Sequence, residues 1–269
     1  MGCMDREHEL LDLAVSIARE AATRARAMRA AGVDPVATKS TLTDVVTAAD
    51  RAVERQVRDA IHAARPGDVV LGEEFGGGEG DGAAVRWILD PIDGTVNYLY
   101  DLPQYAVSLA AEVDGEVVAG VVINAATGRE WTAVRGGGAY ADGRRLSGSG
   151  QTDLRQALVG TGFGYAADRR LHQAAVLAGL IGDIRDVRRF GAAAIDLCLA
   201  AEGSLDAYYE KGLNAWDHAA GGLVAAEAGL LVTGLRGATA GPDMVVAAPP
   251  ALHQGLHDRL VELGADKGP

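Results

Sequence analysis

The chain has 269 residues, of which 48% are hydrophobic, so it can bury a sizeable core as one large domain or as two closely packed halves. Its net charge of -12 disfavours nucleic acid and anionic membranes as partners, because both attract basic surfaces. No apolar run approaches the roughly 20 residues that span a bilayer, the first residues are charged rather than signal-like, and the two cysteines do not suggest a disulfide framework, so we expect a cytoplasmic protein.

Two amphipathic helices are predicted in the first quarter of the chain. Leucine, isoleucine and alanine recur at helical spacing from residue 7 to about residue 30. Thr47 is a good N-cap for a second helix over residues 48 to about 64. Asp50 follows this cap by three residues, which is typical of a capping-box acid and is compatible with a second, chemical role.

The middle of the chain has the pattern of an antiparallel sheet. A buried strand is predicted at residues 86 to 89, and residues 105 to 147 read as strands joined by turns at Asp114-Gly115 and Asp142-Gly143. The glycine-rich segment 75 to 84 is expected to be a mobile loop. Acidic residues in and next to this loop are expected to point into solvent, namely Glu74, Glu79 and Asp81.

The last part of the chain shows a different pattern. Ser147 to Gly150 is the most linker-like stretch, and strands and helices alternate after it. The strands are expected at residues 157–161, 184–187, 207–209, 230–233 and 244–248. The sequence therefore predicts an α+β half over residues 1–147 and an α/β half over residues 151–269, packed as one compact unit.

The most informative stretch runs from Trp87 to Thr95, where an apolar run ends in Asp90 and Asp93. Pro91 stiffens the exit, so both carboxylates are expected to project from one rigid turn. Two carboxylates this close repel each other unless a cation lies between them. Oxygen ligands favour Mg²⁺, Mn²⁺ or Ca²⁺ over zinc. Gly94 allows close approach to a ligand, and N–H groups after it can point at a phosphate. In isolation, the same motif is equally typical of an ordinary turn.

Four segments in this order resemble the motifs of the inositol monophosphatase family, which comprises Mg²⁺-dependent, lithium-sensitive phosphatases. They are Lys39–Asp50, Gly72–Glu74, Asp90–Asn97 and Trp216–Gly221. The resemblance covers most of the chain and implies a layered αβαβα sandwich with the metal site between its two halves, and a homodimer. Periodicity alone predicts only a mixture of α+β and α/β structure.

Matched residue by residue, the resemblance implies the metal ligands. Those of a first Mg²⁺ would be Glu73, Asp90 and the carbonyl of Ile92, and those of a second would be Asp90, Asp93 and Asp217, while Glu73 would reach a third ion through water. A cage of this kind would turn an acidic pocket electropositive, which reconciles a chain of charge -12 with an anionic substrate.

The same comparison implies the catalytic and substrate-binding residues. Thr95 and Asp50 would orient and deprotonate the attacking water, with Glu73 beside them, because a hydroxyl can pass a hydrogen bond from water to a carboxylate. Residues that would bind the phosphate or the ring of the substrate are Asp93, Gly94, Thr95, Gly191, Ala193 and Glu210. Two positions depart from the family pattern: Ala192 replaces a serine or threonine, and Tyr100 replaces a histidine.

We therefore expect a Mg²⁺-dependent phosphomonoesterase that acts on a small phosphorylated polyol or sugar, with myo-inositol 1-phosphate as the first candidate. Fructose 1,6-bisphosphate and histidinol phosphate remain alternatives, since the same metal core serves them. The alternative from another class is an interaction protein that keeps the fold and binds a macromolecular partner.

Other candidate residues are interpreted as structural. His253 and His257 are four residues apart in a predicted helix, and a solvated helix face is favoured over a metal pair. His218 is assigned to a helix surface or to packing, and Cys198 to the core.

Overall fold

The computed structural model describes residues 3–32, 35–38, 45–77 and 84–268. The first motif segment before residue 45, and the acidic residues Glu79 and Asp81 of the glycine-rich loop, lie outside the described residues. The helices are α1 (Cys3–Ala30), α2 (Ala48–Ala64), α3 (Thr95–Leu99), η1 (Leu154–Gln156), α4 (Ala167–Leu180), α5 (Ala193–Glu202), α6 (Ala215–Glu227) and α7 (Pro250–Glu262). The strands are β1 (Pro35–Thr38), β2 (Val45–Thr47), β3 (Val69–Gly72), β4 (Arg86–Asp93), β5 (Ala106–Val113), β6 (Glu116–Asn124), β7 (Glu130–Val134), β8 (Gly138–Ala141), β9 (Arg144–Arg145), β10 (Leu158–Thr161), β11 (Asp186–Arg188), β12 (Ala207–Glu210), β13 (Leu231–Thr233) and β14 (Val245–Ala248).

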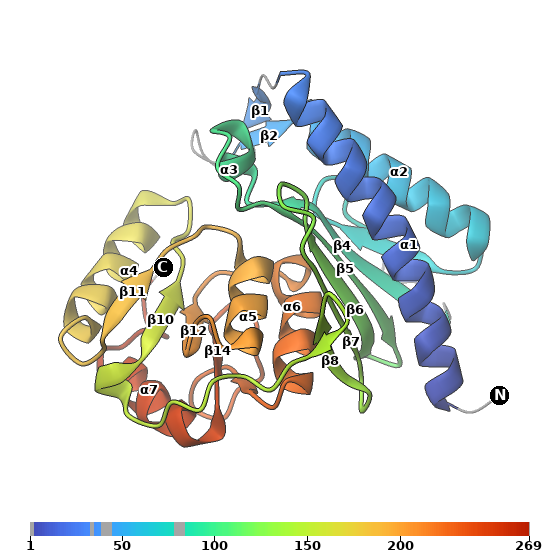
Figure 1. Ribbon diagram of the computed structural model, residues 1–269. Coiled ribbons are helices and arrows are strands. Elements are labelled where there is room, and N and C mark those ends of the chain that lie inside the picture. The colour runs from blue at the N-terminus through green and yellow to red at the C-terminus, as the bar shows by residue number, and fades with distance from the viewer. Residues whose placement is uncertain (1–2, 33–34, 39–44, 78–83, 269) are drawn as a thin grey trace.

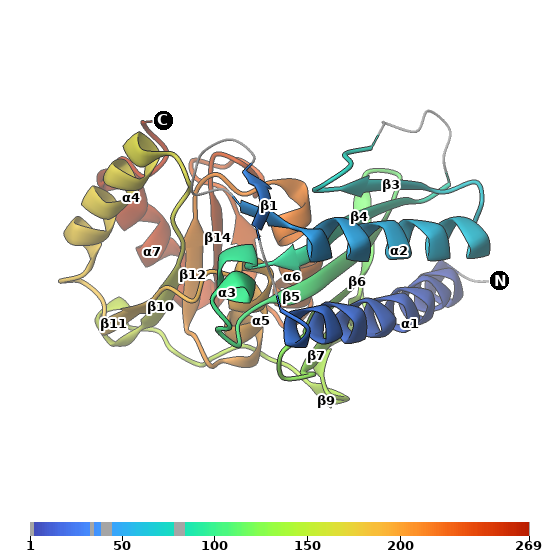
Figure 2. The ribbon, with the colours of Figure 1, turned by 90° about the horizontal axis from the view of Figure 1, so that it is seen from above.

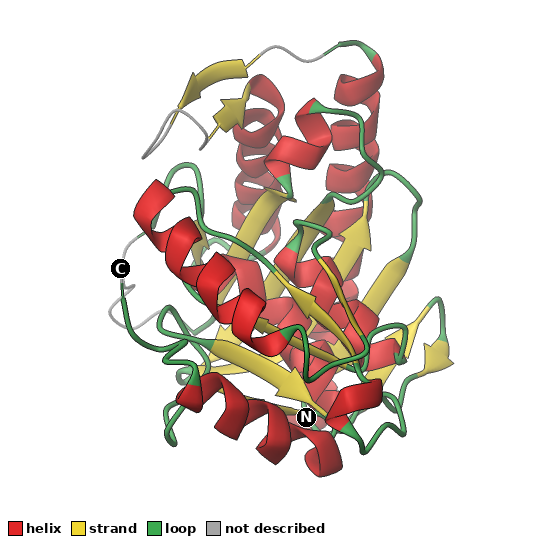
Figure 3. Ribbon diagram, turned by 90° about the vertical axis from the view of Figure 1, so that its left-hand side faces the viewer, coloured by secondary structure: helices red, strands yellow, loops and turns green. Residues whose placement is uncertain are grey.

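These elements form five layers (Figure 1). Helices α1 and α2 cover one face of a seven-stranded sheet of order β3-β4-β5-β6-β7-β8-β9, as the view from above shows (Figure 2). Helices α5 and α6 pack on its other face and against a five-stranded sheet of order β11-β10-β12-β14-β13. Helices α4 and α7 cover the outer face of this second sheet (Figure 3). The expected αβαβα sandwich is confirmed.

Each interface between layers has its own apolar core, and β4 shows how one strand serves two of them. Trp87 and Leu89 pack into the core beneath α1 and α2, whereas Ile88 belongs to the core that α5 and α6 share with both sheets. Successive side chains of a strand point to opposite faces, so a strand buried on both faces reads as a continuous apolar run. The apolar run before Asp90 follows from this position in the middle of the stack.

Local sequence signals explain the boundaries of several elements. Helix α2 begins at Ala48 as predicted, because Thr47 accepts hydrogen bonds from the backbone and Asp50 bonds back to the Thr47 N–H in a capping box. Asp114 and Asp142 adopt positive φ and each precedes a glycine of positive φ, which confirms both predicted hairpin turns. Helix α1 starts at Cys3, four residues earlier than predicted.

Three expectations are wrong. Strand β4 does not end before Pro91: it continues to Asp93 and its pairing with β5 shifts register between Asp90 and Asp93, a place where a proline without an N–H is tolerated. Glu74 is not solvated, because its side chain is 2% exposed beside Arg51. His253 is buried rather than on a solvated helix face, and its ring stacks on His257.

Among the residues that the structure describes, none of the helices combines the length and the apolar character that a bilayer crossing requires.

Candidate active site

A pocket of about 610 Å³ is lined by residues from two parts of the chain, 73–95 and 162–217. Such a volume is typical of sites for small molecules. Its lining combines the end of β4, the turn into α3, the loop after β10 and the N-terminal ends of α5 and α6. The sequence-predicted residues that it brings together are Glu73, Asp90, Ile92, Asp93, Gly94, Thr95, Gly191, Ala193, Glu210 and Asp217. Asp50 lies behind Thr95 and is fully buried.

The acidic residues of this pocket repel one another. Burial raises the pKa of Asp90 well above its ordinary value, and the charges of Glu73, Asp93 and Asp217 raise it further. Burial also raises the pKa of Asp217 well above its ordinary value, again with help from Glu73 and Asp93. Several carboxylates that share one pocket are stable as anions only with a compensating positive charge nearby.

Asp93 connects the end of β4 to the start of α5. Its carboxylate accepts hydrogen bonds from the N–H groups of Ala193 at 3.1 Å and Ala194 at 2.8 Å, in the first turn of α5. A helix N-terminus favours a negative charge in this position. Burial raises the pKa of Asp93 to about 7, although these two hydrogen bonds act in the opposite direction. The N–H of Ala193 is thus occupied by Asp93, so Ala193 offers a ligand surface rather than this donor.

Thr95 and Asp50 form the pair that the sequence predicts. The Thr95 hydroxyl lies 3.2 Å from Asp50 Oδ1 and 3.1 Å from the carbonyl oxygen of Ile92. A hydroxyl has one proton to donate, so it bonds one of these acceptors at a time and keeps lone pairs for an incoming donor. Asp50 Oδ2 accepts from the N–H of Thr47 at 2.8 Å and from its hydroxyl at 2.5 Å. The capping box therefore fixes the carboxylate that faces Thr95.

Gly94 is required by the path of the chain between β4 and α3. It adopts a φ of +87°, and a Cβ built on it would lie 2.7 Å from the carbonyl oxygen of Gln104. Because of both features, any other residue at position 94 would be strained. Gly94 thereby lets the chain turn sharply from β4 into α3, which begins with Thr95.

Glu210 lines the same pocket, at the end of β12. It accepts a hydrogen bond from the hydroxyl of Tyr208, and a Cβ at Gly162 would lie 1.9 Å from its Oε2. Burial raises its pKa, while the bond from Tyr208 and the charge of Arg189 lower it. The carboxylate is therefore held over a glycine and close to a guanidinium group.

The sequence profile of the inositol monophosphatase family matches residues 6–265. The chain belongs to this family. An inositol-1-monophosphatase of Mycobacterium leprae is 47% identical over 92% of each chain, and the solved structure of Mycobacterium tuberculosis SuhB is 42% identical with a TM-score of 0.83, covering 97% of this chain and 98% of that one. A protein of Pseudomonas aeruginosa named Nus factor SuhB is 41% identical over 72% of this chain and 73% of its own. The resemblance inferred from the motifs is confirmed, and the chain is a phosphatase of this family.

The metal ligands of a family phosphatase can be compared with the donors present. In the part of the chain that the structure describes, no three acidic, histidine or cysteine side chains converge tightly enough to hold a metal ion as they stand. The donor set nevertheless fits a hard cation, because four carboxylates and the Ile92 carbonyl line one pocket and the pKa values of three of these carboxyl groups are raised. The ligand set remains a prediction with this chemical support.

One residue of this family phosphatase escaped the sequence analysis. Glu54 is fully buried on α2, where it accepts hydrogen bonds from the N–H groups of Glu74 at 2.8 Å and Phe75 at 3.1 Å and from Arg58 at 2.8 Å. It therefore fixes the backbone directly after Glu73. The available signal was an acid four residues after Asp50, on the apolar face of the predicted helix.

Two arginines of the pocket were also missed as pocket residues. Arg169, near the start of α4, and Arg189, after β11, both line it. The Nε atom of Arg169 is buried and has no hydrogen-bond partner among the described residues. The lining of the acidic pocket thus also includes two arginines.

Proposed function

We propose that the protein hydrolyses myo-inositol 1-phosphate to myo-inositol and phosphate with two or three Mg²⁺ ions. The observation that carries this proposal is the Thr95–Asp50 pair, which reaches a pocket lined by Glu73, Asp90 and Asp217. The M. leprae relative, named inositol-1-monophosphatase, supports this choice of substrate. In-line attack of water on phosphorus requires a positioned base and a compensated anionic phosphate, and this pocket offers groups for both tasks.

The residues that would hold the ions are those already assigned. Glu73, Asp90 and the Ile92 carbonyl would bind one Mg²⁺, and Asp90, Asp93 and Asp217 would bind the other. When bound, Mg²⁺ supplies positive charge to the phosphate and leaving oxygens and lowers the pKa of a nearby water. The same charge would offset the burial and the mutual repulsion that raise the pKa of Asp90 and Asp217.

Thr95 and Asp50 would then handle the proton of the attacking water. Because Thr47 holds Oδ2 of Asp50, the Oδ1 atom is the one that faces the Thr95 hydroxyl. Thr95 would donate its proton to Asp50 and accept a hydrogen bond from water, which places the water oxygen on a defined line toward phosphorus. This arrangement gives the pair an orienting role as well as a basic one.

The remaining pocket residues would bind the substrate. The N–H groups of Gly94 and Thr95 would face phosphate oxygens, next to Asp93. Glu210 would accept hydrogen bonds from ring hydroxyls, with the backbone of Gly191 and the surface of Ala193 beside the ring. The first group would contact the phosphate and the second the ring, so phosphate binding and ring recognition can be tested separately.

The experiment is phosphate release by the purified protein from four esters, with Mg²⁺ and with a chelator. We expect the highest kcat/KM for myo-inositol 1-phosphate, lower values for fructose 1,6-bisphosphate and histidinol phosphate, and measurable turnover of p-nitrophenyl phosphate. We also expect inhibition by Li⁺ that is strongest at saturating substrate. Preference for another ester would agree with a phosphatase activity and would replace myo-inositol 1-phosphate as the proposed substrate.

A second candidate function is supported by the name of the P. aeruginosa relative. The P. aeruginosa protein carries the name Nus factor SuhB, which names no phosphatase activity. We propose accordingly that this chain, as a homodimer, also binds a macromolecular partner. The two functions can be distinguished by complementation of cells that lack the protein. The catalytically impaired Asp90→Asn variant would restore a binding function and would not restore a hydrolytic one.

A further inference from the structure

Lys211, the residue after Glu210, has an ammonium group enclosed by the last described segment of the chain. Its Nζ donates to the carbonyl oxygens of Gly268 at 2.9 Å, Lys267 at 3.1 Å and Asp266 at 3.4 Å. The residue is 8% exposed. Among the described residues it forms no ion pair, and three main-chain carbonyls match the three protons of an ammonium group.

The burial of the Lys211 ammonium group depends on the conformation of the segment around it. A buried charge is costly unless its hydrogen bonds are complete, so the segment from Gly264 to Gly268 must keep its path for Lys211 to stay buried. Two further contacts hold that path: His172 Nε2 donates to the Gly264 carbonyl at 3.2 Å, and Arg236 pairs with Asp266 at 2.6 Å. Neither contact involves the metal-ligand carboxylates.

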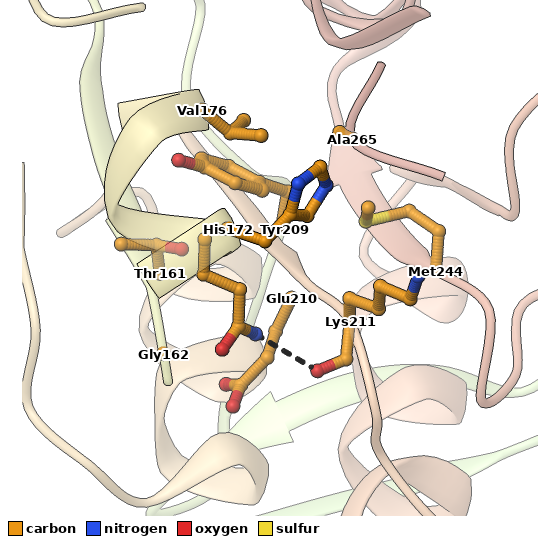
Figure 4. A pocket seen from close by; sticks show the side chains of 10 residues that line it. Thr161, Gly162, His172, Val176, Tyr209, Glu210, Lys211, Met244 and Ala265 are labelled. Carbon is orange, nitrogen blue, oxygen red and sulfur yellow. Dashed lines mark hydrogen bonds between the residues drawn. The ribbon is translucent and has the colours of Figure 1, made fainter. Parts of the chain in front are cut away.

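The backbone of Lys211 is tied to the active-site loop as well. Gln173, on α4, donates to the Lys211 carbonyl oxygen at 3.1 Å and accepts from the N–H of Gly164 at 2.8 Å. Gly164 lies in the loop after β10 that lines the active-site pocket. Figure 4 shows the bond to Lys211, with the side chains of Glu210 and Lys211 pointing away from each other, as expected for consecutive residues at the end of a strand.

On the side of His172 and Gln173, the space around Glu210 and Lys211 is nearly filled. The small cavity between Glu210, Lys211, His172 and Gln173 has a volume of about 10 Å³, which is room for a single water molecule at most. A shift of the main chain at Glu210 would therefore have to displace neighbouring side chains or break the bonds of Lys211. The position of the Glu210 carboxylate is therefore supported by the next residue in the chain, whose ammonium group is bound to the segment Gly264–Gly268.

We propose that Lys211 is a positioning residue for substrate discrimination: by holding the segment Gly264–Gly268 and the Gln173 bridge, it sets Glu210 and the loop at Gly164 for the alcohol part of the ester. This inference rests on the proposed function, in which Glu210 contacts that alcohol. It assigns to Lys211 an effect on binding of the ring, and none on the metal-binding side of the pocket, where the phosphate would lie.

The test compares two substrates in a graded series of full-length variants. Lys211→Met keeps most of the length of the side chain and removes all three donors, whereas Lys211→Gln has a shorter side chain with two neutral donors. We expect Lys211→Met to raise KM for myo-inositol 1-phosphate about tenfold with little change in kcat, and Lys211→Gln to have an intermediate KM. The kcat and KM for p-nitrophenyl phosphate should stay within about twofold of wild type in both variants. The reason is that a small displacement of a contact already removes much of its effect on the substrate that makes it. Lys267→Met, an exposed lysine in the same segment, is the matched control and should equal wild type.

A second route to the same result avoids Lys211 itself. Gln173→Leu should reproduce the KM effect, and the double variant with Lys211→Met should lose less than the product of the two single losses, because both act through one backbone position. Equal losses on the two substrates, or a wild-type KM for myo-inositol 1-phosphate in both Lys211→Gln and Gln173→Leu, would overturn the proposal. Failure of the wild-type protein to hydrolyse either ester would instead refute the proposed function.

Discussion

Replacing Asp90 by asparagine should stabilise the metal-free protein while it removes activity. Asp90 is almost fully buried, and its Oδ1 accepts a hydrogen bond from the N–H of Ile92 at 3.0 Å. An asparagine can keep this acceptor. The substitution therefore removes a buried negative charge that Glu73, Asp93 and Asp217 destabilise, without leaving the Ile92 N–H unsatisfied.

The magnitudes follow from the same geometry. Relief of a buried, poorly compensated polar group is worth about 1–3 kcal/mol, and for a chain of this size that raises Tm by roughly 2–12 °C. Binding of Mg²⁺ at 100 times its Kd should stabilise the wild-type protein by about 2.7 kcal/mol, and Asp90→Asn should lose most of this gain. The rate of phosphate release should fall by about 10² to 10⁴.

Thermal unfolding with EDTA and with Mg²⁺ measures both effects, alongside phosphate release. Asp59→Asn, an exposed acid on α2, serves as the control and should behave as wild type in each condition. A lower Tm of Asp90→Asn in EDTA together with an undiminished Mg²⁺ shift would refute the reasoning, because Asp90 would then be neither destabilised by its neighbours nor a ligand.

Three further predictions concern other parts of the molecule. Thr95→Ala and Asp50→Asn should each lower kcat by about 10² to 10⁴ at unchanged Mg²⁺ affinity, and the double variant should be no slower than the slower single one in single-turnover assays; multiplied losses would argue against a shared role. Glu210→Gln should lower kcat/KM for myo-inositol 1-phosphate by about 10 to 150-fold and leave p-nitrophenyl phosphate nearly unaffected, and equal losses on both would exclude Glu210 from the ring pocket. Burial, and next the neighbouring His257, lower the pKa of His253 in the folded state. The contribution of His253 to stability is therefore complete above the unfolded pKa of about 6.5 and is lost as the pH falls below it. Urea unfolding from pH 7.5 to 5 should show a smaller loss of stability for His253→Gln than for wild type, and an equal loss would contradict this.

Those parts of the fold that depend on local chemistry could be predicted from the sequence. Thr47 and Asp50 are three residues apart and form the capping box that starts α2, so its boundaries followed from a few residues. In the last part of the chain, the predicted strands lie within one residue of those observed at either end, except β11, whose start was predicted two residues early because a short exposed strand carries little apolar signal. The layered order required the family resemblance, because periodicity does not specify which faces pack together.

The candidate site was predictable only in part. Asp90, Asp93 and Asp217 stand in recognisable motifs, and the structure brings them to one pocket. Glu54 and Lys211 could not be assigned, because their partners are backbone groups 20 and more than 50 residues away in the chain. The continuation of β4 through Pro91 was missed for a related reason: a register shift against β5 is a property of the strand pair, not of one segment.

Phosphate release from myo-inositol 1-phosphate, measured as a function of Mg²⁺ concentration, tests the central claim most directly. We expect no turnover above background in EDTA, activity that rises with Mg²⁺ to a plateau, and a shift of this dependence to higher Mg²⁺ in Asp217→Asn with the same Thr95–Asp50 pair intact. Turnover in EDTA equal to that in saturating Mg²⁺, or an Asp217→Asn variant with an unchanged Mg²⁺ dependence, would contradict it.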